Sequence, residues 1–352
     1  MFLETIVMTC LKQIHGQRSD SSIYHLLTGK KSIQTIQDAH IYQLQNYYGI
    51  CKRMSKQQLN EKIQLLYRAG LLHSVSSKES IPLVNKRGDA WLRTYRKKYP
   101  VHYFRGMEYN GIADVFYQRF ILFIQTLTNS HNNHFSFIPV IDQPSVETWM
   151  KNVYRKAKGK EAEILHSLYN ELSDLLQKFS DVEANIFVDR LTGFNHYGMS
   201  LNQLAGRYKL PFMDVYLLLT GVIHRILSEV IHHRKSYPLI AFIISDLQKQ
   251  STLTKSAEYT LELWKKGLTI SEIASRRRLK ESTIRDHLVE IAFYVDDFPI
   301  EQYIHNEKLQ QIQQAMEKVN SYKLKDIKQL IDEDISYFQI RLVLAVQNKL
   351  VN

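Results

Sequence analysis

A short pattern of apolar and small residues occurs twice in this sequence, in the same frame and 69 residues apart. The first copy consists of Leu204, Ala205, Leu210, Val215 and Leu219, and the second of Ile273, Ala274, Leu279, Ile284 and Leu288. In a helix-turn-helix, a small residue lets the helices cross closely, an apolar turn residue fills the crossing, and two apolar residues four apart face the core. Two copies in frame are stronger evidence for this motif than either copy alone.

The second copy carries cations and hydroxyls on the positions that face away from its core. Such side chains at a helix N-terminus donate hydrogen bonds to phosphates and base edges. They are Arg276, Arg277, Arg278, Lys280, Ser282, Thr283 and Arg285. We expect this surface to bind DNA, and the alternative is a packing module with a solvated basic turn. Arg278 stands where these motifs most often have glycine, which predicts a left-handed or remodelled turn.

The first copy has an aromatic and apolar outward face instead. Its members are Phe212, Met213, Tyr216 and Leu217. Such a surface cannot pair with phosphates, and a contiguous apolar patch is rarely left in water. We therefore interpret this copy as a degenerate helix-turn-helix that either binds a protein partner or packs against helices of its own chain.

Glycine and proline are scarce, which favours a helical protein. The chain has 352 residues, enough for two or three domains, but only 13 Gly and 7 Pro. We expect a mainly α fold of several helical modules, including helix-turn-helix units, with a small winged-helix-like β-hairpin near the N-terminus. The predicted domains are a basic winged-helix-like domain at 1–105, a helical domain at 106–250 containing the degenerate motif at about 186–227, and a helix-turn-helix domain with a helical tail at 251–352.

The first of these domains holds all of the excess positive charge. Residues 1–105 contain 17 Lys and Arg against 6 Asp and Glu, which equals the net charge of +11 for the whole chain. Helical periodicity is followed by two short predicted strands at 71–75 and 81–84, around a turn at 76–80, which is the winged-helix order. We expect this module to dominate non-specific DNA affinity through phosphate contacts. The candidate cations are Lys52, Arg53, Lys56 and, at the end of the predicted wing, Lys86 and Arg87.

No local motif supports an enzyme, a cofactor, a metal or a small-molecule ligand. Residues 28–32 contain a Gly-Lys pair but lack the leading glycine of a phosphate-binding loop, so we do not expect a helicase motor. His131 and His134 have metal-like spacing, but no cysteine or acidic ligand lies nearby, which favours an exposed loop.

The cysteines and the hydropathy predict a soluble protein of the cytoplasm. Cys10 and Cys51 are expected to be buried free thiols, as is usual in a reducing compartment. The longest apolar run, at 239–244, falls far short of the roughly 20 residues that span a bilayer, and the first ten residues do not resemble a signal peptide. We expect no membrane association, and we leave association with the nucleoid open.

Two parts of the chain are similar to known proteins. Residues 253–291, with the later segments 324–328 and 335–345, resemble the helicase-associated helix-turn-helix domain at the C-terminus of bacterial RecQ-type helicases. With residues 29–71 included, the whole chain resembles the YpbB-type proteins of Bacillus-like bacteria, which are encoded beside a short RecQ-type helicase that lacks this module. The resemblance implies DNA binding in support of a helicase, through Lys280, Ser282, Thr283 and Arg285.

Three hypotheses follow for the function. The first is a non-enzymatic DNA-binding accessory protein that recruits or assists a RecQ-type helicase in DNA repair or recombination. The second is a helix-turn-helix transcription regulator, and the third is a structural adaptor that does not touch DNA. Regulators usually dimerise and read repeated half-sites, whereas two unlike copies lie on this one chain, which favours the first hypothesis.

Overall fold

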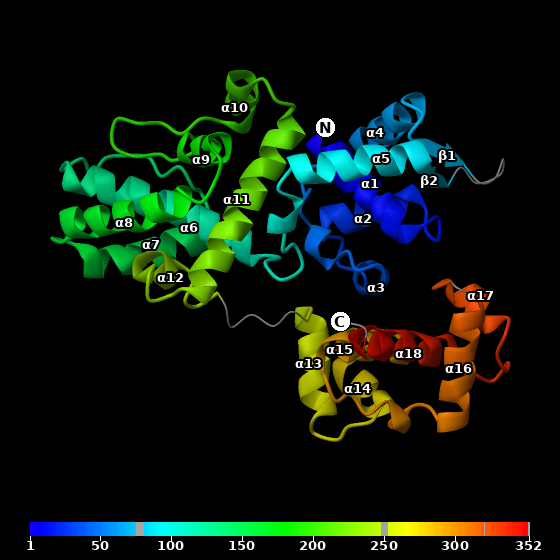
Figure 1. The fold of residues 1–352 in the computed structure, drawn as a ribbon. Coiled ribbons are helices and arrows are strands. Elements are labelled where there is room, and N and C mark those ends of the chain that lie inside the picture. Colours follow the sequence, from blue (N-terminus) through cyan, green and yellow to red (C-terminus); the bar gives the residue numbers. More distant parts are fainter. Residues whose placement is uncertain (75–80, 248–252, 320, 351–352) are drawn as a thin grey trace. The chain divides into compact units, whose positions relative to one another are not determined.

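The computed structural model describes residues 1–74, 81–247, 253–319 and 321–350. These residues are mostly helical, with one two-stranded antiparallel sheet near the N-terminus, so the predicted mainly α fold is confirmed (Figure 1). The chain forms two compact units. One unit contains Met1–Ile6 and Leu92–Gln250, and the other contains Val7–Trp91 and Ser251–Asn352. This division differs from the predicted three domains because two continuous helices, α1 (Phe2–Ile14) and α5 (Lys86–Lys98), each contribute residues to both units.

The unit that contains residues 7–91 begins as a winged helix. Its elements after α1 are α2 (Asp20–Thr28), α3 (Ile33–Ile41), η1 (Gln45–Tyr47), α4 (Lys56–Arg68), β1 (Leu72–Ser74) and β2 (Pro82–Val84). The strands pair in antiparallel register, with Leu72 opposite Val84, which confirms the predicted hairpin. The turn predicted at 76–80 lies outside the described residues. Ser55 and Gln58 form a capping box that starts α4, and the helix buries the stripe Leu59, Ile63 and Leu66.

The residues after the hairpin are helical, which corrects the prediction that Lys86 and Arg87 end a wing. They occupy the first turn of α5, because Asn85 accepts the Gly88 N–H at 2.9 Å and starts the helix there. Asn85 also donates its side-chain amide to the Gly70 carbonyl at 3.0 Å, which ties α5 to the end of α4. Gly88 is required at this crossing, since a Cβ there would lie 2.3 Å from the Leu71 carbonyl oxygen.

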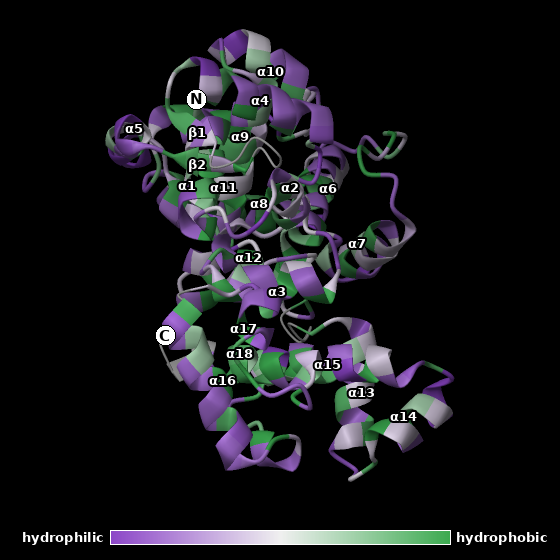
Figure 2. Ribbon diagram, turned by 90° about the vertical axis from the view of Figure 1, so that its right-hand side faces the viewer, coloured by the Kyte–Doolittle hydropathy of each residue, from purple (hydrophilic) through white to green (hydrophobic). Residues whose placement is uncertain are grey.

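The second part of the same unit is a helical domain built around one buried helix. Its elements are α13 (Lys255–Trp264), α14 (Ile270–Arg277), α15 (Glu281–Tyr294), η3 (Ile300–Gln302), α16 (Asn306–Val319), α17 (Leu324–Lys328) and α18 (Tyr337–Leu350). The core joins Leu288, Ile291 and Ala292 of α15 to Leu342 and Ala345 of α18. Figure 2 shows the contrast in composition, since α18 is largely hydrophobic whereas α5 is mostly hydrophilic.

Helix α3 also packs against α15 within this unit. The His40 ring stacks on the Phe293 ring with their centroids 4.5 Å apart. Arg341 of α18 donates its Nε to the Gln37 side chain at 3.2 Å, and it pairs with Asp286 of α15 at 2.6 Å. Residues far apart in the sequence therefore share one core in this unit.

The other unit is all helical after α5. Its elements are η2 (Val101–Tyr103), α6 (Ile112–His131), α7 (Pro144–Ala157), α8 (Glu161–Leu176), α9 (Asp181–Val188), α10 (Leu201–Tyr208), α11 (Phe212–His232) and α12 (Pro238–Ile243). Among the described helices, α11 is long and apolar enough to cross a membrane, judged by length and composition alone, and 56% of its most apolar window is buried inside the protein. That burial is typical of a core helix.

The two helix-turn-helix copies have the same backbone geometry at the predicted offset. Helices α10 and α14 start at Leu201 and Ile270, and each begins with a capping box. Each ends at a left-handed residue, Lys209 (φ 51°) in the first copy and Arg278 (φ 52°) in the second, so the left-handed turn expected at Arg278 is present.

The apolar turn residue does not fill the crossing in the second copy, and this part of the prediction is wrong. Leu279 is 37% exposed. The crossing is closed instead by Ile273, Ala274 and Ile284, which cluster with Leu263 of α13.

The start of α1 is capped by a buried carboxylate of α11. Asp214 accepts hydrogen bonds from the backbone N–H groups of Phe2 at 3.2 Å and Leu3 at 3.1 Å, and all three residues are buried. A helix N-terminus has N–H groups without intrahelical partners and attracts negative charge, so Asp214 satisfies donors that water cannot reach.

We predict that Asp214→Ala lowers the free energy of unfolding by about 1–3 kcal/mol, because it leaves two buried donors unpaired. Urea unfolding of the full chain measures this loss. Asp142→Ala, on an exposed loop position, is the control and should leave the urea midpoint unchanged. Equal midpoints for the two variants would show that the cap does not stabilise the fold.

Candidate nucleic-acid interface

The first turn of α15 presents polar side chains to solvent. Ser282 and Arg285 are exposed and Thr283 is half-buried, while Arg285 pairs with Glu281 one turn earlier at 3.0 Å. Lys280 stands at the N-cap position and makes no side-chain capping hydrogen bond. The positive end of the helix dipole therefore coincides with a cationic residue, an arrangement that favours an anion such as phosphate.

The three arginines before this turn have different environments. Arg276 and Arg278 are exposed beside Lys280, as a phosphate-contacting role requires. Arg277 is turned inward, which corrects its prediction as a DNA contact. Its guanidinium donates to the Ser256 carbonyl and the Ser256 hydroxyl, each at 2.8 Å, and lies 5.0 Å from the Tyr259 ring centroid. This side chain joins α14 to α13.

A buried histidine lies behind Arg277. His287 shares a hydrogen bond of 2.8 Å with the Thr260 hydroxyl, and its Nδ1 lies 3.3 Å from the guanidinium of Arg277. Burial and the charge of Arg277 lower the pKa of His287 to about 4, against an opposing effect of Asp286. The imidazole is therefore neutral near pH 7 and belongs to the packing of α15.

The rest of α15 is covered by other helices. Residues 287–293 are buried, and Asp286 is held by Arg341. The surface that the second copy can offer to DNA is thus limited to the exposed basic turn and the first turn of α15. It comprises Arg276, Arg278, Lys280, Ser282, Thr283 and Arg285.

The cations predicted in the N-terminal domain are all exposed. Lys52 and Arg53 precede α4, Lys56 is its first residue, and Lys86 and Arg87 lie on the first turn of α5. Lys56 also acts on a neighbouring histidine: burial lowers the pKa of His25, and the charges of Lys30 and Lys56 lower it further.

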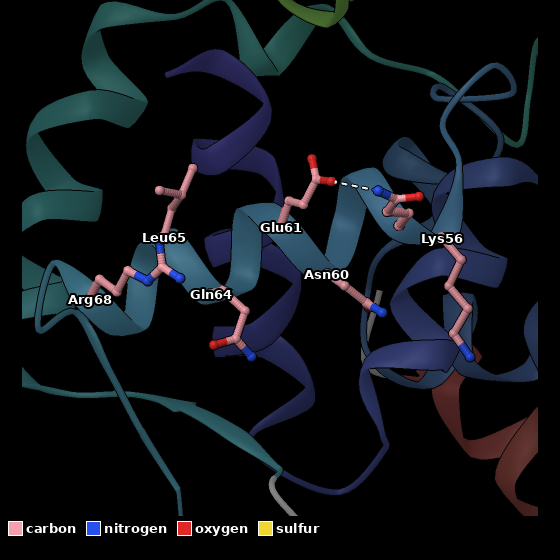
Figure 3. Close-up of a pocket in the computed structure, with 7 residues that line it drawn as sticks. Lys56, Asn60, Glu61, Gln64, Leu65 and Arg68 are labelled. Carbon is pink, nitrogen blue, oxygen red and sulfur yellow. Dashed lines mark hydrogen bonds between the residues drawn. The ribbon is translucent and has the colours of Figure 1, made fainter.

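Of the outward face of α4, the sequence predicted only Lys56 as a candidate DNA contact. Its side chains line an open, shallow pocket along the helix, drawn in Figure 3. They are Lys56, Gln57, Asn60, Glu61, Gln64, Leu65 and Arg68. The sequence does contain a signal for this face. Leu59, Ile63 and Leu66 form the buried stripe of α4, and the opposite face of such a helix is solvated.

The apolar residues predicted for a partner in the first copy do not form an exposed patch. Met213 is 6% exposed and Leu217 is 0% exposed, because both face the core of their unit. Phe212 and Tyr216 are half-buried. Of the two alternatives, packing within the chain accounts for Met213 and Leu217, and their prediction as partner-binding residues is wrong.

The described residues contain no group of three or more His, Cys, Asp or Glu side chains that could hold a metal ion. Cys10 and Cys51 are free and buried, and burial raises the pKa of both thiols.

Comparison with known proteins identifies two domains in this chain. Residues 5–102 match the family model of the RQC domain, and residues 256–344 match the family model of a helix-turn-helix domain. Both are domains of the C-terminal part of RecQ proteins, so the chain has a RecQ-like arrangement of DNA-binding domains. Protein YpbB of Bacillus subtilis (strain 168) is 31% identical over 348 residues, which cover 98% of this chain and 97% of that protein. The chain therefore belongs to the YpbB family. No solved structure matches it.

We predict that Arg278→Gly raises stability while weakening DNA binding. A left-handed backbone costs a non-glycine residue on the order of 1 kcal/mol, so glycine stabilises the turn, whereas the lost charge removes a phosphate contact. Urea unfolding and DNA titration of the full chain measure the two effects. Arg278→Gln, the matched control, should weaken DNA binding equally without the gain in stability. If both variants had the same unfolding midpoint, the turn would not be strained.

We also predict a pH dependence that comes from His287. Its folded pKa of about 4 lies below the unfolded value near 6.5, so its contribution to stability is complete above pH 6.5 and is lost as pH falls towards 4. The loss relative to His287→Gln should reach about 3 kcal/mol at most. Urea midpoints of the full chain across this range test it, with His305→Gln, an exposed position, as the control. Parallel curves for wild type and His287→Gln would contradict it.

Proposed function

We propose that this protein is a non-enzymatic accessory factor that binds DNA and supplies its RQC and helix-turn-helix domains to a RecQ-type helicase on another chain. The observation that carries the proposal is the presence of both domains on one chain, at residues 5–102 and 256–344. Both are DNA-binding domains, and neither is catalytic. The setting we propose is DNA repair or recombination in the cytoplasm, where the DNA itself lies.

The electrostatics support the DNA-binding half of this proposal. The excess charge of +11 lies in residues 1–105, which contain the matched RQC domain. The exposed cations at Lys52, Arg53 and Lys56 lie together at the start of α4. On duplex DNA each phosphate contact adds about 0.9 to the slope of log affinity against log salt, so several contacts give steep salt dependence.

Reconstitution with the helicase tests the proposal. The full-length protein is co-expressed with the short RecQ-type helicase from the same genome, and co-purification and unwinding of a forked duplex are measured. We predict that the two proteins co-purify and that unwinding increases when the accessory protein is present, most clearly at salt concentrations where the helicase alone binds DNA weakly.

A charge variant separates DNA binding from helicase binding. The triple variant Lys52→Gln, Arg53→Gln, Lys56→Gln should still co-purify with the helicase but should stimulate unwinding less and show a smaller salt slope. The control removes the same charge from exposed positions of the other unit, Lys156→Gln, Lys158→Gln and Lys160→Gln. Absence of both co-purification and stimulation would refute the helicase role, and equal loss with both triple variants would refute the assignment of the DNA-binding surface.

A further inference from the structure

The middle of the chain belongs to neither of the matched DNA-binding domains. The family models match residues 5–102 and 256–344, whereas the similarity to YpbB extends over 98% of the chain and so includes the segment between them. Residues 106–250, which make up most of this segment, contain 14 Lys and Arg against 14 Asp and Glu, so their net charge is zero. A neutral segment has no general attraction for a polyanion such as DNA.

An open groove lies between α8 and α9 in this segment, with a volume of about 640 Å³ (both helices are labelled in Figure 1). Most of the residues that line it are apolar. Tyr169 of α8 is 68% exposed and Val188 of α9 is 42% exposed, while Leu172, Leu176 and Ala184 are half-buried. Each helix therefore presents an apolar stripe to the groove.

The same two helices already bury another face. Leu168 and Leu175 of α8 are buried, and so are Ile186 and Phe187 of α9. The residues of the groove are thus additional to those that form the core of the unit. An exposed apolar surface of this kind marks an interaction site.

One charged residue, Asp181, lines the groove. Within the part of the chain that the structure describes, its carboxylate forms no hydrogen bond or ion pair. Lys178, the nearest cation in the sequence, is held by Glu229 at 3.2 Å and by the Tyr237 hydroxyl at 2.8 Å. An occupant without a cation would bury the charge of Asp181 unpaired, which is strongly unfavourable. A second copy of the chain related by two-fold symmetry would bring this same acidic surface against itself.

We propose that the groove between α8 and α9 binds an amphipathic helix of the helicase chain, with its apolar face in the groove and a flanking Lys or Arg paired with Asp181. Apolar residues spaced three and four apart on such a helix are the usual anchors in a groove of this kind. This inference rests on the proposed function and deepens it, because it names the docking surface and the chemistry of the partner segment.

The separation of the domains from the helicase explains why a docking surface is needed. Domains that are joined covalently to a helicase stay at high effective concentration and need no binding site for it. Domains supplied on another chain must bind the helicase, and the segment that neither family model matches is available for this purpose.

The affinity of the full-length protein for the short RecQ-type helicase tests the proposal. The double variant Tyr169→Glu, Val188→Glu places charge on exposed positions of the groove. It should keep the wild-type urea midpoint, DNA affinity and salt slope for DNA, but bind the helicase about tenfold or more less tightly. The control Tyr197→Glu, Val140→Glu changes the same residue types at positions of the same unit that are at least as exposed, and it should bind the helicase as the wild type does.

The outcomes separate the inference from the proposed function. Unchanged helicase binding by the groove variant, or an equal loss in the control, would overturn the inference and leave the helicase role intact. Absence of helicase binding by the wild type would refute the helicase role itself.

A second variant tests the charge. Asp181→Asn should weaken helicase binding and reduce its dependence on salt, because it removes the ion pair and leaves the apolar lining in place. Asp142→Asn, at an exposed loop position, is the control and should change neither property. A salt dependence that stays the same in Asp181→Asn would contradict the proposed pairing.

A photo-crosslinking amino acid in place of Tyr169 identifies the occupant in the complex with the helicase. We expect crosslinks to one helicase segment that has apolar residues at helical spacing and Lys or Arg beside them. Crosslinks to a second copy of this chain, crosslinks to a helicase segment without that pattern, or no crosslinks to the helicase would each overturn the inference.

Discussion

The burial of α15 against its neighbours determines how the helix-turn-helix at the C-terminus can be used. Helices α13 and α18 cover the body of α15, and α3 packs on its C-terminal half through His40 and Phe293. Arg341 holds Asp286 at the border of the covered region. The exposed residues of α15 are Glu281, Ser282 and Arg285 at its N-terminal end, next to the exposed basic turn. The motif therefore exposes a short basic edge rather than the full length of its second helix.

The two copies show how one backbone geometry serves two purposes. Both turns pass through a left-handed residue, and both first helices begin with a capping box. The difference lies in the first turn of the second helix. Asp214 in the first copy corresponds to Thr283 in the second, and its carboxylate caps α1. The same end of a helix thus binds the protein's own backbone in one copy and is left exposed in the other.

The sequence predicted features that depend on local spacing. The offset of 69 residues located both turns, the unusual Arg278 predicted the left-handed backbone, and the alternation of short apolar runs predicted the hairpin. Features that depend on packing between distant segments were not predictable. The sequence does not distinguish the inward-facing arginine among Arg276, Arg277 and Arg278. Arg277 is turned inward because α13 offers its guanidinium the Ser256 carbonyl. The division into two units differs from the predicted domains, and α1 and α5, which contribute to both units, are continuous helices that carry no linker signal.

Two candidate DNA-contacting surfaces lie on one chain, and joining them has a physical consequence for the proposed DNA binding. The edge around Lys280 has few cations and can neutralise few phosphates, so alone it would bind DNA weakly and with a shallow salt dependence. Joining it covalently to a second surface makes the second binding event intramolecular, which raises the overall affinity without any new contact. Under the proposed function a small motif is then sufficient, because the charged N-terminal domain would supply the initial attraction and the motif would add contacts to a complex that has already formed.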